Sequence, residues 1–191
     1  MPQGEEQTDA TTTNHHPGPG AGAPARYRAG VPGRQPTHFK KGGEPVCTVS
    51  SSGASSSTTC SASLSGLGNG DLLIEVTVSG SAVYQCSNNG GNTAPGQNKV
   101  LVGPTTTPTL IPGDQIKNGN VSFTTEAAVL TAPATVTGAH AGCPNPNWTG
   151  VNPTLTTTDI SMRISQGGVL LFSCAAASNP NGLSGRVPLA C

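Results

Sequence analysis

Charged residues are scarce in this sequence. Its 191 residues include 9 Lys+Arg and 9 Asp+Glu, so charged residues make up only 9% of the chain, against about 25% in an average globular protein. The two signs balance to a formal net charge of zero, which leaves no basic surplus to bind the phosphates of a nucleic acid. We therefore expect no nucleic-acid partner.

Long apolar runs and aromatic side chains are also lacking. No apolar run approaches the roughly 20 residues that a membrane-spanning helix needs, so we expect no membrane span. No sustained helical pattern rich in Ala, Glu, Lys and Leu occurs, which argues against a helical bundle. Because aromatic residues are only 3% of the chain, the buried side chains of a folded domain must come mainly from Val, Ile and Leu.

The charges that do occur are concentrated near the N-terminus. Residues 1–45 hold nine of the 18 charged residues, and all six cysteines come later. We place a boundary near Gly42-Gly43, with residues 1–44 as a leader and 45–191 as the folded domain. The Gly-, Pro- and Ala-rich run over residues 17–24 cannot bury enough apolar area to offset the entropy of ordering it. The leader is therefore predicted to be disordered.

No signal peptide is visible in the leader, because the required apolar stretch of 7–15 residues does not occur between Met1 and Cys47. Residues 14–43 are rich in Gly, Pro, Ala, Arg and His without periodicity. Such a composition is typical of GC-rich DNA read in the wrong frame. We therefore expect either that the given start is not the native one or that a frameshift replaced the leader 1–44.

Alternation of apolar and polar residues predicts strands in the second part. Over residues 72–79, Leu72 and every second residue after it are apolar, which is the pattern of a half-buried strand. We predict that the chain turns at Ser79-Gly80-Ser81 and that residues 82–86 return as the second strand of a hairpin.

A second hairpin is predicted from residues 160–165 and 169–174, with its turn at Gln166-Gly167-Gly168. Weaker strand candidates occur at 46–49, 58–64, 99–102, 105–110, 120–125 and 135–137. Short strands separated by Gly, Pro and Asn are typical of a sandwich of two sheets. The predicted fold is therefore all-β: a disulfide-stapled β-sandwich, Ig-like or jelly-roll-like, preceded by a disordered N-terminal segment.

An even number of widely spaced cysteines predicts three disulfides; they are Cys47, Cys60, Cys86, Cys143, Cys174 and Cys191. Fifteen pairings are open. We favour Cys47–Cys60, which joins neighbouring strands, and Cys174–Cys191, which closes the C-terminal loop; Cys86–Cys143 is then left. Such bonds do not persist in the cytosol, so we expect a secreted, extracellular protein although no signal peptide is visible.

Metal ligands do not cluster in the sequence. No CxxC pair is present, so a zinc site is unsupported. His15 and His16, even with the distant His38, have no fixed geometry in a disordered leader. We expect no metal site and no cofactor.

The loop at residues 88–98 is rich in amides. Its Asn-Gly and Gly-Gly steps tolerate positive φ, and the side chains of Asn88, Asn92, Gln97 and Asn98 can satisfy backbone groups of the loop. Two interpretations are open: an ordered connection held by a disulfide, or a recognition loop on a rigid scaffold.

The same segment carries a resemblance. Cys86 is followed by Asn89-Gly90-Gly91-Asn92 and by Pro95-Gly96-Gln97-Asn98, and a later Cys143-Pro144 is followed by Asn145. In this pattern the chain resembles a family of small secreted actinobacterial proteins of unknown function. The resemblance covers about residues 45–175. It implies a secreted β fold, supports the Cys86–Cys143 pairing and implies no known activity.

Arrangements of catalytic residues are not apparent. His140 is the only His after residue 45 and lies in a glycine-flanked, flexible segment, and no Gly-x-Ser-x-Gly elbow occurs. The five carboxylates after residue 45 are scattered, whereas a glycosidase needs an opposed pair. We therefore expect a protein that is not an enzyme.

Two functions remain as predictions. The first is a structural or assembly role outside the cell, because a neutral surface rich in Thr, Ser, Asn and Gly allows self-association or cell-wall contact with little repulsion. The alternative is an extracellular binding module for a glycan or a protein, including a protease-inhibitor-like role. This module would use the 88–98 loop with the rings of Tyr84 and Trp148, although the favoured interpretation of Trp148 is a core side chain that packs over the disulfide.

Overall fold

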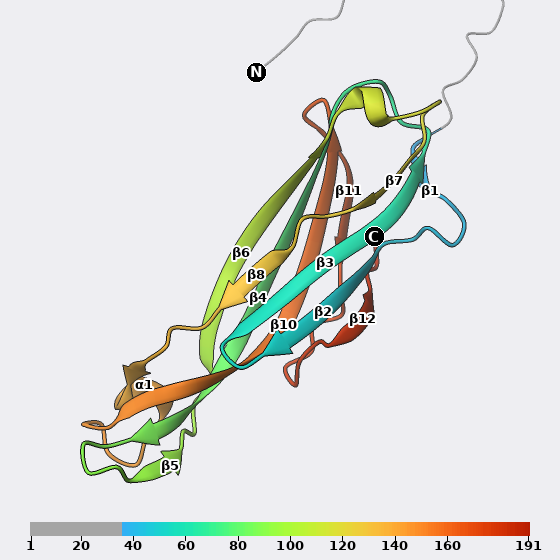
Figure 1. Cartoon of the computed structure of the whole chain (residues 1–191). Helices are drawn as coiled ribbons and strands as arrows, with labels where there is room; N and C mark the ends of the chain where they lie inside the picture. The colour runs from blue at the N-terminus through green and yellow to red at the C-terminus, as the bar shows by residue number, and fades with distance from the viewer. Residues whose placement is uncertain (1–35) are drawn as a thin grey trace, which may run out of the picture. The chain divides into compact units, whose positions relative to one another are not determined.

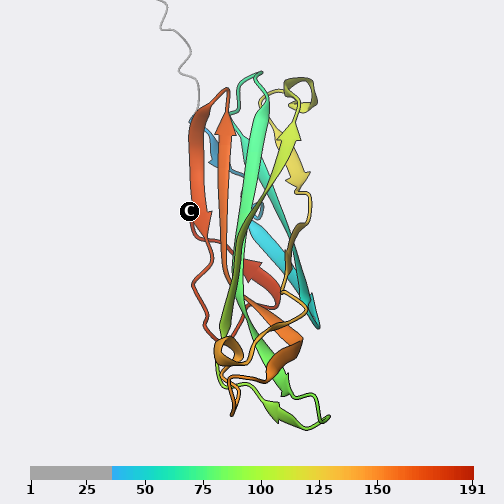
Figure 2. The ribbon, with the colours of Figure 1, turned by 90° about the vertical axis from the view of Figure 1, so that its left-hand side faces the viewer.

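The computed structural model describes residues 36–191, which form an all-β domain of two sheets that contains three disulfides. Figures 1 and 2 show the two layers from directions 90° apart. The predicted disulfide-stapled β-sandwich is confirmed. The disorder predicted for the leader falls on residues 1–35, as do His15 and His16, and these lie outside the described residues. Residues 36–44, which we also placed in the leader, have a defined structure.

The first sheet is built around β3 (Ser55–Ser65), which forms a hairpin with β2 (Val46–Ser52). The far edge of β2 pairs with β12 (Gly185–Pro188). Three short strands also pair with β3, and they are β1 (His38–Phe39), β7 (Val121–Thr124) and β8 (Ala128–Thr131).

The second sheet is built around β4 (Leu72–Ser87) and β10 (Thr149–Gln166), which pair antiparallel along nearly their whole length. The far edge of β4 pairs with β6 (Val100–Ile111) and β5 (Thr93–Pro95). The far edge of β10 pairs with β11 (Val169–Ala175) and β9 (Val136–Thr137).

The turn predicted at Gly80 is wrong, because β4 runs straight through this residue. A Cβ at Gly80 would lie 2.3 Å from the carbonyl oxygen of Thr156 in β10, so the glycine permits a close approach of two backbones instead of a reversal. At the same level, β6 and β10 each carry one extra residue relative to β4. These β-bulges sharpen the local bend of the sheet.

The hairpin predicted from residues 160–165 and 169–174 is confirmed as β10 and β11. Gly167 and Gly168 make its turn with φ of 58° and 82°. However, β10 begins at Thr149, eleven residues earlier than predicted. The bulge between Thr157 and Asp159 explains the difference, because it moves the buried positions from odd-numbered to even-numbered residues and so hides the alternation.

Other elements differ from the prediction in extent. The candidates 99–102 and 105–110 form one strand, β6. The elements that were not predicted are the strands β1, β5, β8 and β12, the 3-10 helix η1 (Gly113–Gln115) and the helix α1 (Gly138–Ala141). In β1, the ring of Phe39 lies 4.4 Å from that of Phe172 in β11. The folded domain therefore begins before residue 45.

The core lies between the two sheets and is aliphatic, as predicted. Leu64 from the first sheet and Ile74 and Met162 from the second are completely buried. Polar contacts also cross this core: the hydroxyls of Ser56 in β3 and Thr157 in β10 lie 2.7 Å apart. The two sheets are therefore locked in one relative position by both packing and hydrogen bonding.

Candidate functional site

The predicted site residues lie at one end of the second sheet, which we call the tip (residues 82–98 and 133–154). The backbone N–H of Leu155 donates to the carbonyl of Gly53, which lies in the turn between β2 and β3. The strand residues 149–154 therefore extend past the end of the first sheet. Figure 1 shows β5 and α1 beside these extended ends of β4 and β10.

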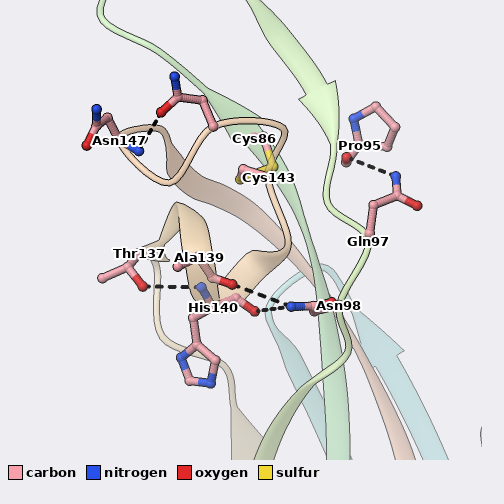
Figure 3. The surroundings of a disulfide bond; sticks show 10 residues. Cys86, Pro95, Gln97, Asn98, Thr137, Ala139, His140, Cys143 and Asn147 are labelled. Carbon is pink, nitrogen blue, oxygen red and sulfur yellow. Dashed lines mark hydrogen bonds between the residues drawn. A yellow bond between two sulfur atoms is a disulfide. The ribbon is translucent and has the colours of Figure 1, made fainter.

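All three predicted disulfides are formed, and Cys86–Cys143 belongs to the tip. Cys86 is completely buried in β4, while Cys143 follows the short helix α1. The bond ties the central strand to a segment 57 residues further along the chain. Figure 3 shows it between the strand and the loop that carries Asn147.

The segment around His140 was predicted to be flexible, but in the structure it forms the helix α1. The Thr137 hydroxyl caps α1 by accepting a hydrogen bond from the backbone N–H of His140 at 3.3 Å. Gly142 ends the helix in the left-handed conformation, with φ of 68°. His140 itself is exposed at the surface.

The end of the 88–98 loop is hydrogen-bonded to α1, as Figure 3 shows. The side-chain amide of Asn98 donates to the carbonyls of Ala139 and His140, at 3.4 and 3.2 Å, and its backbone N–H donates to Ala141. The carbonyl of Ala139 also accepts from the backbone N–H of Gly142, whereas those of His140 and Ala141 have Asn98 as their donor at the end of the helix. Asn98 therefore has the structural role predicted for the loop amides.

Asn88 also has that role, at the start of the loop. Its Oδ1 accepts hydrogen bonds from the backbone N–H groups of Gly90 and Asn92, at 3.0 and 2.9 Å. The amide of Gln97 donates only locally, to the carbonyl of Pro95. The side chain of Asn92 is exposed and makes no hydrogen bond to the described residues. Of the four amides, those of Asn92 and Gln97 are therefore the least engaged in holding the loop.

Tyr84 does not have the exposed ring that the binding prediction needs. It is 2% exposed, and its hydroxyl donates to the carbonyl of Pro133 at 2.9 Å. The burial raises the pKa of Tyr84. Trp148 is half-buried and packs against the core. The two rings therefore do not form a shared exposed platform.

The outer face of the tip carries a hollow of about 550 Å³, which sequence reasoning missed. Val83 and Pro95 supply apolar surface to it, and Gln85 and Asn152 supply amides that are hydrogen-bonded to each other at 3.0 Å. Asn152 lies at a bulge of β10 with φ of 49°. The sequence signal for this bulge is the pair Asn152-Pro153, because Asn tolerates a positive φ and Pro is found at irregular positions of strands.

No Lys, Arg, Asp or Glu occurs between Glu75 and Lys99, or between Glu126 and Asp159. The tip therefore carries no Lys, Arg, Asp or Glu side chain, and His140 is its only histidine. Within residues 36–191, no three His, Cys, Asp or Glu side chains lie close enough together to hold a metal ion. No helix in that range is long and apolar enough to cross a membrane.

No protein-family model matches this chain. A search of curated proteins likewise finds no match to it. The resemblance to small secreted actinobacterial proteins, which depends on residues 84–98 and 143–145, stays a prediction.

Proposed function

We propose that this chain is a secreted or cell-surface structural module that assembles with further copies or with the cell wall, and that it is not an enzyme. The observation that carries this proposal is the neutral, disulfide-closed surface. The formal net charge is zero, and the tip contains no Lys, Arg, Asp or Glu. Copies of such a protein can approach closely without long-range repulsion.

The disulfides support an extracellular location for this role. Three bonds close the domain and no free cysteine remains among the described residues. Bonds of this kind persist in oxidising compartments, and each stabilises a fold by about 2–4 kcal/mol. A structural module outside the cell benefits from this stability because chaperones of the cytosol are not available there.

Light scattering of the purified full chain over a range of concentrations tests the assembly role. We expect the mean mass to rise with concentration. In parallel, the mass after alkylation with and without reductant counts the disulfides, and six labels are expected only after reduction. A constant monomer mass at every concentration would contradict assembly, and labelling without reductant would contradict the extracellular location.

A second candidate function is supported by the hollow on the tip. An uncharged hollow with amides and an apolar floor suits a neutral ligand such as a glycan. A glycan array with the full chain tests this function. Binding that is lost in Asn152→Ala, and kept in Asn147→Ala from the same uncharged tip but outside the hollow, would support it. A Trp148→Ala variant then tells whether the half-buried ring contributes.

A further inference from the structure

The free edges of the two sheets differ in how well they are protected from pairing with another strand. Natural proteins protect edges with proline, charge or short strand length. The edge strand β6 carries Pro104 and Pro108. The edge strand β12 is four residues long and contains Arg186 and Pro188. The edge strands β7 and β8 are also only four residues long.

The edge strand β11 has none of these three protections, and its one irregularity is a β-bulge opposite Ile164 and Ser165. Its residues 169–173 read Val-Leu-Leu-Phe-Ser, with no charge and no proline. Val169 is 65% exposed and Leu170 is 48% exposed. Figure 2 shows β11 at the left-hand margin of its sheet, with β10 on one side only.

The backbone along this edge is unpaired over part of its length. Ala175 exchanges two hydrogen bonds with Ala190, at 2.8 and 2.9 Å, on the side that faces away from β10. Alternation of an antiparallel ladder places the N–H and C=O of Ser173 on the same side. Neither group has a backbone partner within residues 36–191. The C-terminal segment, held by Cys174–Cys191, therefore covers one end of β11 and leaves residues 169–173 open.

We propose that residues 169–173 of β11 pair antiparallel with the same residues of a second copy of this chain. The inference deepens the proposed assembly role, on which it rests, by naming the contact. Antiparallel pairing of a strand with its own copy has two-fold symmetry, so each copy offers the same surface to the other. The sheet order β6-β4-β10-β11 then continues directly into the partner's β11.

Charge does not oppose this contact. The nearest charged side chain on the same sheet is Arg163, which lies one strand inward and pairs across the ladder with Glu75. The segment 169–173 itself contributes no charged side chain to the two-fold contact. Because the paired segment is only five residues long, the interface belongs to the small class, and we expect a dissociation constant roughly in the micromolar to millimolar range.

Sedimentation velocity of the full chain tests the contact with two matched variants. Leu170→Lys places a charge on the open edge. Leu101→Lys makes the same chemical change on β6, where Leu101 is 85% exposed and Pro104 protects the edge. Because Leu170 occurs twice in a two-fold dimer, we expect Leu170→Lys to weaken association by more than about tenfold. Leu101→Lys is expected to associate like the wild type.

Hydrogen exchange supplies a second measurement that does not depend on a variant. We expect the amide of Ser173 to become protected as the concentration of wild-type protein rises. Protection that is independent of concentration would mean that another part of the same chain covers the edge, which would overturn the proposal. Association that persists in Leu170→Lys would overturn this contact but leave the assembly role intact. A wild type that stays monomeric throughout would contradict both.

Discussion

Buried hydroxyls of the core fall into two kinds, those with a partner and one without. Ser56 and Thr157 are bonded to each other across the sheets. Thr58, two residues further along β3, is 1% exposed, and its Oγ1 has no hydrogen-bond partner within residues 36–191. An unpaired buried hydroxyl costs about 1–3 kcal/mol of desolvation. In Thr58 this cost offsets the stability gained by burying the methyl group of the same side chain.

Thr58→Val is expected to stabilise the domain by about 1 kcal/mol, because valine keeps the shape of threonine and removes the unpaired hydroxyl. Ser56→Ala is the matched contrast in the same strand. It leaves the Oγ1 of the fully buried Thr157 without its partner and is expected to destabilise by about 1–3 kcal/mol. Urea unfolding of both variants measures the two changes, and a destabilised Thr58→Val would contradict the account.

Asp159 makes the stability of the folded domain depend on pH in the acidic range. Hydrogen bonds from Ser178, then Thr158, and more weakly Ser79, hold the pKa of this carboxyl below its ordinary value of 3.8. A pKa that is lower in the folded chain adds stability above pH 3.8, and the addition is lost as the pH falls through the folded-state pKa. The stability gap between the wild type and Asp159→Asn is therefore expected to narrow below pH 3.8.

Carboxyl titration by NMR checks the cause of this shift. Ser178→Ala removes the largest contribution and is expected to raise the pKa of Asp159 toward 3.8. An unchanged pKa in this variant would mean that Ser178 does not hold the carboxylate in solution.

Among the elements, β4 and β10 decide the architecture, because they alone span both the sandwich and the tip. Their close approach at Gly80 has no space for a side chain, since a Cβ there would lie 2.3 Å from the carbonyl oxygen of Thr156. Gly70 offers a contrast: a Cβ there meets nothing nearer than 3.7 Å.

Gly80→Ala is expected to destabilise the domain by about 1–3 kcal/mol, because the two strands must separate to admit the methyl group. Gly70→Ala is expected to change the stability by less than about 1 kcal/mol. Thermal unfolding of the two variants measures the difference. Equal midpoints for both would show that the backbones at Gly80 can separate without cost.

Much of the fold could be predicted from alternation, and the main error had a single origin. Leu72, Ile74, Val76 and Val78 face the core as predicted. The same parity, continued through Gly80, reaches Tyr84 and Cys86, which are also buried. Glycine suits both a turn and a close approach of two strands. The sequence therefore predicts a turn at Gly80, where the structure has one continuous strand. Tyr84 therefore lies on the core face and not on the binding surface predicted for it.

Short elements were missed for a different reason. In β5 and β12, prolines at Pro95 and Pro188 read as strand breakers, although edge strands tolerate them. The hollow on the tip depends on Gln85 and Asn152, which are 67 residues apart in the chain. Local patterns do not contain such a pairing, so this part of the site needed the three-dimensional register of β4 and β10.

At the scale of the whole molecule, the disulfides differ most in the length of chain that they close. Cys47–Cys60 closes 13 residues and joins facing positions of one hairpin, whereas Cys86–Cys143 closes 57 residues. In the chain-entropy account, the longer loop restricts the unfolded state more, by about 1 kcal/mol for this ratio of lengths.

Replacing Cys86 and Cys143 together by Ala is therefore expected to lower the free energy of unfolding by about 1 kcal/mol more than the same replacement at Cys47 and Cys60. Guanidinium unfolding of the two double variants measures both losses. Equal losses, or the reverse order, would contradict the entropic account. Hydrogen exchange in the Cys86/Cys143 variant is expected to increase first around α1, which this bond holds against β4.

The bond between Cys174 and Cys191 has a consequence for mechanical load. Cys191 is the last residue described, and its sulfur is joined to the buried Cys174 of β11. A pulling force applied at this end passes through the sulfurs into the second sheet and bypasses β12. The segment between the two cysteines, residues 175–190, therefore carries no tension, and β12 cannot be pulled away from β2 before the body of the sandwich bears the force.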